Sequence, residues 1–275
     1  MSYATLMVYL DLDHSNDARL NIAGALAERF EASVIGVAAC LQTMPLYFTD
    51  GFVADSLIDQ DRAEIEKRLC ATEERFRASL AGRAKRIEWR CAMTPPTAYV
   101  AEQCRAADLV IIGANRDGVR LDPLRQLVPS DLVTVAGRPI LVIPQEVEVL
   151  AANRVIIGWK DAPEARRAVF DALPLLQRCE KAIVAEIDEN DDPNVARAHV
   201  DDVVAWLRHH GVNASGTVRP MIARASEELD AVARQEEADL IVVGAFGHSR
   251  LREWVLGGVT RDLILRTPRC TLFAH

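Results

Sequence analysis

Short, almost continuous apolar runs alternate along the chain with longer segments in which apolar residues recur about every 3.6 positions. One such run lies in "AADLVIIGAN", residues 106–115, and the helical pattern "AYVAEQCRA" comes just before it. Strands that alternate with helices of ten or more residues are typical of βαβ units and a parallel sheet. The runs are apolar throughout, as expected when helices cover both faces of the sheet. The pattern therefore predicts an α/β fold.

The pattern occurs twice. "EADLIVVGAF", residues 237–246, repeats residues 106–115, and both halves open with an apolar strand, an acidic turn and a helix. Both halves also close alike, with "DLVTVAGRPILVIP" and "DLILRTPRCTLFAH", in which a helix ends at Gly or Pro and an apolar strand follows. "PQEVEVLAANR" is the predicted join. We therefore expect two tandem Rossmann-like domains, residues 1–146 and 152–275.

The first half also carries extra sequence, residues 41–80. Its front part, with Met44, Pro45, Tyr47 and Phe48, predicts a loop, and its back part predicts a long charged helix. The aromatic residues could contact a ligand or a partner, or they could hold the loop on its own domain.

Composition narrows the class of protein. The net charge of −8 indicates no broad basic surface for nucleic acid or anionic lipid. The N-terminus lacks the basic segment of a signal peptide, and no apolar run reaches the length of a membrane span. The six cysteines are scattered without a C-x-x-C pair, as expected of reduced thiols. We expect a cytoplasmic protein that binds neither nucleic acid nor membrane.

A glycine-rich segment follows the fourth strand of the second half. Its glycines are Gly244, Gly247, Gly257 and Gly258. Gly244 stands at the carboxyl end of a predicted parallel strand, where ligands of such sheets bind and where a glycine lets a ligand approach the backbone. The amides at the start of the next helix, near Val259 and Thr260, could receive a phosphate, with the Thr260 hydroxyl as a further donor. Alternatively, the glycines only shape a βα turn and a helix end.

Other chemistry has little support in the sequence. No Gly is followed by Lys, and no G-x-G-x-x-G or G-x-S-x-G occurs, which disfavours a P-loop NTPase, a dinucleotide dehydrogenase and an α/β-hydrolase. Ser226 and Ser249 have no base or orienting acid nearby in sequence. The histidines show no metal-ligand spacing. We expect no catalytic residue and no protein-bound metal.

The spacing Gly-x2-Gly-x9-Gly, together with the repeat, resembles the ATP-binding pattern of the universal stress protein family over essentially the whole chain. The resemblance implies two five-stranded parallel sheets of strand order 3-2-1-4-5. It also implies a stress-response role and an adenine nucleotide, ATP with or without Mg²⁺, in the C-terminal domain. A homodimer or a pairing of the two domains within the chain is implied as well. At most weak ATP hydrolysis is expected.

Two positions depart from the family pattern. Gly258 stands where the family has Ser or Thr, and Lys160 stands where ATP-binding members have an Asp at the end of the first strand, with Asp161 one place later. Lys160 could approach phosphate or be solvated, and Trp159 could stack on adenine or belong to the core. The predicted nucleotide site comprises Gly158, Trp159, Lys160, Asp161, Gly244, Gly247, His248, Gly257, Gly258, Val259 and Thr260.

The first half shows the complementary loss. It keeps Asp11 at the strand end, but of the loop glycines only Gly113 remains. Larger side chains stand at the three matching positions, which are Arg116, Gln126 and Leu127. They would hold a nucleotide away from the backbone, so we expect the first half to be structural or to bind another ligand. A free anion at Arg116 and Arg120 is one such possibility.

Three functions follow from these residues. The first is a nucleotide-responsive binding module, the second a scaffold of the same family that binds no nucleotide, and the third a slow ATPase or self-phosphorylating protein. Retained nucleotide separates the first two, and ADP release with turnover would favour the third.

Overall fold

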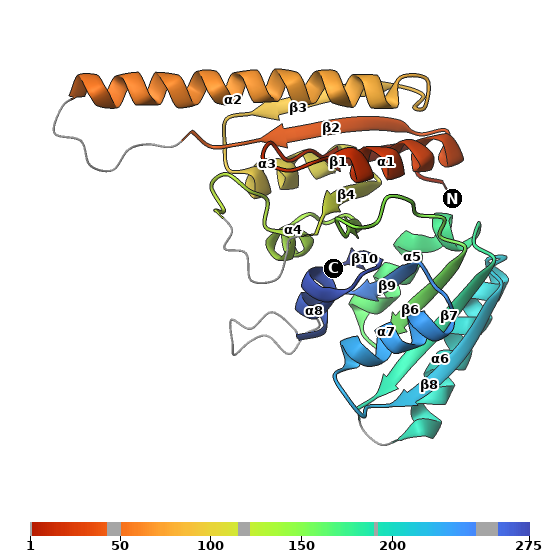
Figure 1. Cartoon of the computed structure of the whole chain (residues 1–275). Coiled ribbons are helices and arrows are strands. Elements are labelled where there is room, and N and C mark those ends of the chain that lie inside the picture. The colour runs from red at the N-terminus through yellow and green to blue at the C-terminus, as the bar shows by residue number, and fades with distance from the viewer. Residues whose placement is uncertain (1, 43–50, 115–121, 190–191, 246–257) are drawn as a thin grey trace.

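The computed structural model of the chain describes residues 2–42, 51–114, 122–189, 192–245 and 258–275 (Figure 1). The elements of the first half are β1 (Thr5–Tyr9), α1 (Asp17–Phe30), β2 (Ser33–Ala39), α2 (Gly51–Leu80), β3 (Ile87–Ala92), α3 (Pro96–Gln103), the 3-10 helix η1 (Cys104–Ala106), β4 (Leu109–Gly113), α4 (Pro129–Val135) and β5 (Ile140–Ile143). Those of the second half are β6 (Arg154–Trp159), α5 (Pro163–Leu176), β7 (Lys181–Asp188), α6 (Pro193–His209), β8 (Ala214–Pro220), α7 (Ala225–Gln235), β9 (Leu240–Gly244), α8 (Gly258–Arg266) and β10 (Cys270–Ala274).

The strands form one ten-stranded sheet in the order β3-β2-β1-β4-β5-β10-β9-β6-β7-β8. Within each half every neighbouring pair is parallel and the order is 3-2-1-4-5, which confirms the predicted α/β fold and its topology. The halves meet through β5 and β10, which pair antiparallel with Leu141 opposite Leu272. The two domains therefore pair within the chain, which is one of the two arrangements that the resemblance implied.

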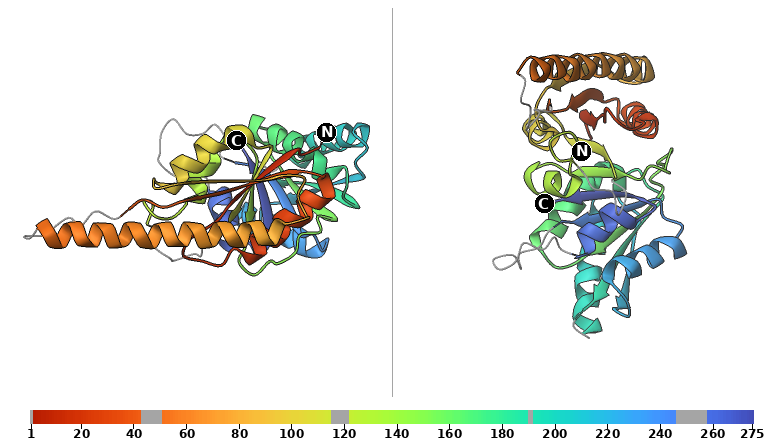
Figure 2. Two further views of the ribbon diagram at one scale, coloured as in Figure 1. Left: turned by 90° about the horizontal axis from the view of Figure 1, so that it is seen from above. Right: turned by 60° about the vertical axis from the view of Figure 1, so that its left-hand side comes forward.

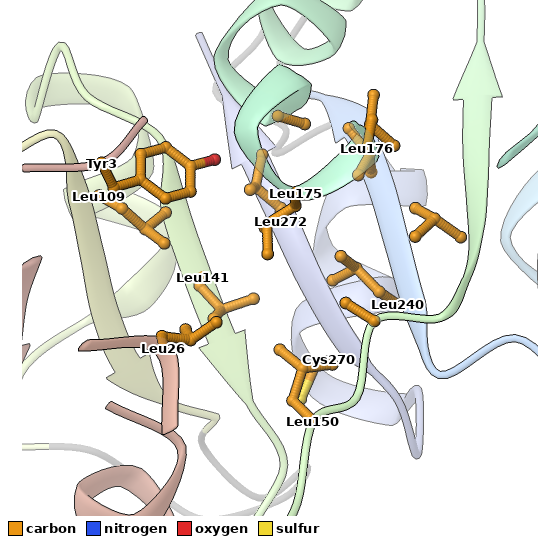
Figure 3. Close-up of a cluster of buried hydrophobic side chains, with 14 of the residues drawn as sticks. Tyr3, Leu26, Leu109, Leu141, Leu150, Leu175, Leu176, Leu240, Cys270 and Leu272 are labelled. Atoms are coloured by element: carbon orange, nitrogen blue, oxygen red, sulfur yellow. The ribbon is translucent and has the colours of Figure 1, made fainter. Parts of the chain in front are cut away.

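The core continues across this join. Strand residues alternate between two faces, so Leu141 and Ile143 of β5 enter one cluster while Ile140 and Val142 enter the other. Figure 3 shows Leu141 of β5 beside Leu272 of β10, with Leu175 of α5 close by. Because these buried side chains come from both halves, neither half closes its core alone.

Polar contacts fasten the same join. The Tyr3 hydroxyl donates to the carbonyl of Asp171 in α5 at 2.7 Å. Arg29 donates to the carbonyls of Ala151 and Arg178, each at 2.7 Å. The Arg178 guanidinium lies 4.4 Å from the centre of the Phe30 ring. The two halves thus hold a fixed relative position.

Helix α2 is the long charged helix predicted within residues 41–80. One stripe of the helix is buried against the outer edge of the sheet, namely Ile65, Leu69, Phe76 and Leu80. Figure 2 shows its N-terminal part extending beyond the sheet. The predicted loop residues of the insertion, Met44, Pro45, Tyr47 and Phe48, lie outside the described part of the chain. None of the described helices is long and apolar enough to cross a bilayer.

Candidate functional site

The predicted site of the second half lies at the carboxyl ends of β6 and β9, which are neighbours in the sheet with Gly158 opposite Val243. Helix α5 starts a few residues after β6, and α8 begins at Gly258. Parallel α/β sheets bind their ligands at this edge, between strands whose connections leave in opposite directions. The fold therefore brings the described members of the predicted site to one place.

Gly244 is required by packing. A Cβ added there would lie 2.5 Å from the backbone nitrogen of Ala165 and 2.6 Å from the carbonyl carbon of Glu164. Its φ lies outside the left-handed region, so backbone conformation does not demand glycine. The missing side chain lets the first turn of α5 approach the end of β9. Gly158 has a similar role, since a Cβ there would lie 2.8 Å from a methyl group of Val243.

The start of α8 is the exposed part of the site. Gly258 is exposed, and a Cβ added there would have no atom within 4 Å. Val259 is half-buried and packs against the core, while Thr260 is buried with 4% of its surface exposed. The first amides of a helix have no partner within the helix, and Gly258 adds no side chain beside them.

The end of β6 has a buried and an exposed side. Trp159 keeps only 8% of its surface exposed and belongs to the core, which favours the core interpretation over stacking on adenine. Lys160 is exposed, and its ammonium lies 2.6 Å from a carboxylate oxygen of Glu189. Asp161 is also exposed and pairs with Arg166 at 3.3 Å. Lys160 thus forms an exposed ion pair at the strand end where ATP-binding members of the family have an Asp.

A half-buried acid that sequence reasoning missed lies next to Trp159. Glu186 of β7 pairs with Trp159 in register, and its Oε1 lies 3.2 Å from Nδ1 of His199. Burial raises the pKa of the Glu186 carboxyl, and the contact with His199 opposes that rise. The other carboxylate oxygen and the Trp159 indole nitrogen are both buried without a hydrogen-bond partner. The only signal in the sequence was an acid within the apolar run of β7.

Three predicted residues, Gly247, His248 and Gly257, lie outside the described part of the chain, as do Arg116 and Arg120 of the first half. Across the described ranges, no group of three or more His, Cys, Asp or Glu side chains is placed to hold a metal ion.

The equivalent crevice of the first half contains a pocket of about 810 Å³. Gly113 lies on its wall, and the Arg19 guanidinium covers it, since a Cβ on Gly113 would lie 3.3 Å from that group. Arg19 is buried and donates to the carbonyls of Tyr9 and Ser15, each at 3.0 Å. Arg19 thus fills the space over Gly113 that the backbone of α5 fills over Gly244.

Among the described residues that line this pocket, four acids outnumber the one arginine, Arg19, which disfavours a polyphosphate. Its acidic lining residues are Asp11, Asp17, Glu146 and Glu148. The Asp11 carboxylate accepts hydrogen bonds from the amides of Asp13 and His14 and therefore shapes its own turn. Gln126 and Leu127 line the pocket where the second half has glycine, and Leu127 is buried.

Comparison with known proteins agrees with this geometry. Residues 186–272 match the sequence model of the universal stress protein family. The match lies entirely within the second half of the chain, from β7 to β10. No curated protein matches the chain.

Solved structures extend the likeness in fold to the whole chain. A universal stress protein from Archaeoglobus fulgidus DSM 4304 is 13% identical, with a TM-score of 0.74, over 98% of this chain and 97% of that one. A functionally unknown protein from Pseudomonas aeruginosa PAO1 is also 13% identical, with a TM-score of 0.59, over 99% of this chain and 92% of that one. These likenesses show that the chain shares its fold with both structures over nearly the whole of each chain.

Proposed function

We propose that the second universal stress protein domain, taken as residues 152–275, binds an adenine nucleotide, ATP with or without Mg²⁺, and that the chain acts as a nucleotide-responsive binding module in the cytoplasm. The observation that carries the proposal is the exposed start of α8. Gly258 is exposed, with open space where a Cβ would be, and α8 begins there, at the strand edge where parallel α/β sheets bind ligands. The first half, residues 1–146, would then have a structural role.

The chemistry at this point suits a phosphate. The first amides of a helix have no partner within the helix and lie at the positive end of its dipole. Gly258 adds no side chain over them, so a phosphate oxygen could reach the backbone. The Lys160 ammonium forms an exposed ion pair with Glu189, which offsets part of its attraction for a phosphate. Recognition would therefore rest on backbone donors.

Three substitutions at Gly258 test this assignment because each acts on the phosphate differently. Gly258→Ser supplies the hydroxyl that the family has, which is worth about 1 kcal/mol, or roughly a fivefold tighter complex. Gly258→Glu places a carboxylate on the free amides, which stabilises the helix by about 0.3–1 kcal/mol but repels a phosphate. Gly258→Ala is the matched control, since its Cβ fits the open space.

Calorimetric titration of the nucleotide-stripped chain with ATP and Mg²⁺ measures the outcome. We expect about one ATP per chain, tighter binding for the Ser variant, near-normal binding for the Ala variant and none for the Glu variant. The melting temperature of the Glu variant should equal or exceed that of the unsubstituted chain, which would show that it is folded. Equal ATP affinity in the Glu variant would exclude the start of α8 as the phosphate site.

Absence of binding at millimolar ATP would favour the scaffold of the same family. One observation supports that second candidate, namely the ion pair that occupies Lys160 at the strand end. Slow ATP hydrolysis is the third candidate, and sustained ADP release by the unsubstituted chain would support it.

A further inference from the structure

Two of the six cysteines are exposed, and they lie on neighbouring elements. Cys70 belongs to α2 and Cys91 to β3, and both are exposed. The other cysteines are buried or half-buried and are Cys40, Cys104, Cys179 and Cys270. The exposed pair is therefore the part of the thiol set that a soluble oxidant reaches first.

The packing of α2 on β3 brings these two thiols to the same level. The Phe76 ring of α2 lies 5.6 Å from the Trp89 ring of β3, which fixes how the elements align. The chain reverses direction between them, as Figure 1 shows. Cys91 lies two residues beyond Trp89, about 7 Å along the strand. Cys70 lies six residues before Phe76, about 9 Å along the helix in the same spatial direction.

The side chains also lie on facing surfaces. Trp89 and Cys91 are two apart in a strand and so point to the same face, the one that α2 covers. The Cys91 thiol lies within electrostatic reach of both Glu73 and Cys70 of α2, and the Trp89 side chain hydrogen-bonds to it. Burial is the main cause that raises the pKa of Cys91. The alignment of the two elements and the electrostatic interaction of the thiols therefore place Cys70 and Cys91 on the same stretch of the contact between α2 and β3.

We propose that Cys70 and Cys91 form a reversible oxidative modification site, at which hydrogen peroxide converts the two thiols into a disulfide that fastens α2 to the edge strand β3.

The reaction balances in two steps. The Cys70 thiolate attacks one peroxide oxygen, the O–O bond breaks, and a sulfenic acid and hydroxide result. Cys91 sulfur then attacks the sulfur of Cys70, the S–S bond forms, and the sulfenic oxygen leaves as water. The hydroxide takes up the thiol proton, so two thiols and one peroxide give one disulfide and two waters. We assign the first oxidation to Cys70 because the raised pKa of Cys91 makes it the less reactive thiol.

The disulfide would act on the most prominent projection of the molecule. The N-terminal part of α2 extends past the sheet, and apolar contacts of its C-terminal part, such as Phe76 with Trp89, hold it in place (Figure 2). A covalent link at Cys70 would anchor the part of α2 that packs on the sheet, next to the buried Leu69. Oxidation would thereby limit how far the helix can lift away from β3.

Peptide mapping of the full chain tests the proposal. Protein treated with hydrogen peroxide is alkylated, digested with trypsin without reduction and sequenced by mass spectrometry. We expect residues 69–75 joined to residues 91–105, about 2 Da lighter than the sum of the two peptides. Fragment ions must place the link at Cys91 rather than Cys104, which shares its peptide. Dithiothreitol should release both peptides.

Single substitutions give the controls. Cys70→Ser and Cys91→Ser should each abolish the joined peptide, whereas Cys179→Ser, at a half-buried thiol, should leave it unchanged. In the unsubstituted chain, thiols titrated after denaturation should fall by two from six. A disulfide between chains, a sulfenic acid that persists on Cys70, or an unchanged thiol count would each overturn the proposal.

Discussion

The two halves of the chain provide a matched experiment on one position of the repeat. Gly113 ends β4 and Gly244 ends β9, so the same substitution, glycine to alanine, can be made at equivalent points. At Gly244 the new methyl group would lie 2.5 Å from the backbone nitrogen of Ala165. At Gly113 it would lie 3.3 Å from the end of the Arg19 side chain. The first contact is with helix backbone and the second with a side chain.

The magnitudes follow from what can move. Forcing a methyl group into a closely packed contact costs about 1–3 kcal/mol, because the surrounding structure must shift. Replacing glycine also returns about 0.4–1 kcal/mol by restricting the unfolded chain, since neither glycine has a left-handed φ. Gly244→Ala should therefore lower the free energy of unfolding by about 1–2 kcal/mol. Gly113→Ala should change it by less than about 0.5 kcal/mol, because the Arg19 guanidinium can yield by a few tenths of an ångström.

Urea unfolding, followed by circular dichroism and by tryptophan fluorescence, measures the free energy of unfolding of each variant and its dependence on urea concentration. Coincident transitions for the two probes would establish that one free energy describes the chain. If both variants lose the same stability, the close approach of α5 to Gly244 is not what requires glycine there. A larger loss for Gly113→Ala would refute the role given to Arg19.

Two further predictions concern the join and the half-buried acid Glu186. Tyr3→Phe keeps the ring but removes the hydrogen bond to the carbonyl of Asp171, so urea titration should show a free energy of unfolding about 1 kcal/mol lower. A decrease of only a few tenths of a kcal/mol would show that this bond adds little to the join. For Glu186, burial raises the pKa of the folded state above the ordinary 4.5, so the folded protein holds the proton more tightly and stability falls as pH rises through that interval. The free energy of unfolding of Glu186→Gln should therefore increase relative to that of the unsubstituted chain as the pH rises from about 4.5. If the difference between the two free energies stays constant with pH, this reasoning is wrong.

The sequence was sufficient to predict which strands and helices each half contains and how they follow one another along the chain. Apolar strands and periodic helices gave the parallel fold, while the order 3-2-1-4-5 came from the family resemblance. No sequence pattern predicted that β5 pairs antiparallel with β10. Both are short apolar runs, and such a run is equally compatible with pairing to another strand and with lying at a sheet edge covered by a helix. Which edges meet depends on shape and side-chain packing, as between Leu141 and Leu272.

The candidate site was only partly predictable for a similar reason. A glycine at a strand end indicates that something approaches closely, but not whether it is a ligand or another part of the chain. At Gly244 the approaching group is the backbone of α5. Lys160 could be judged only once Glu189 was in place, because the acid follows in sequence by 29 positions. Glu186 escaped notice since strand acids are ordinarily exposed.

The antiparallel join of β5 and β10 has a consequence for how the two halves can differ. In an assembly of identical chains, every substitution appears on both sides of the interface, so a change that suits one side is imposed on the other. Here both sides belong to one polypeptide, and a short connector keeps them together whatever the protein concentration. Arg19 can therefore cover Gly113 in one half while Ala165 approaches Gly244 in the other. Covalent linkage lets an otherwise two-fold arrangement carry a different chemistry at each of its two crevices.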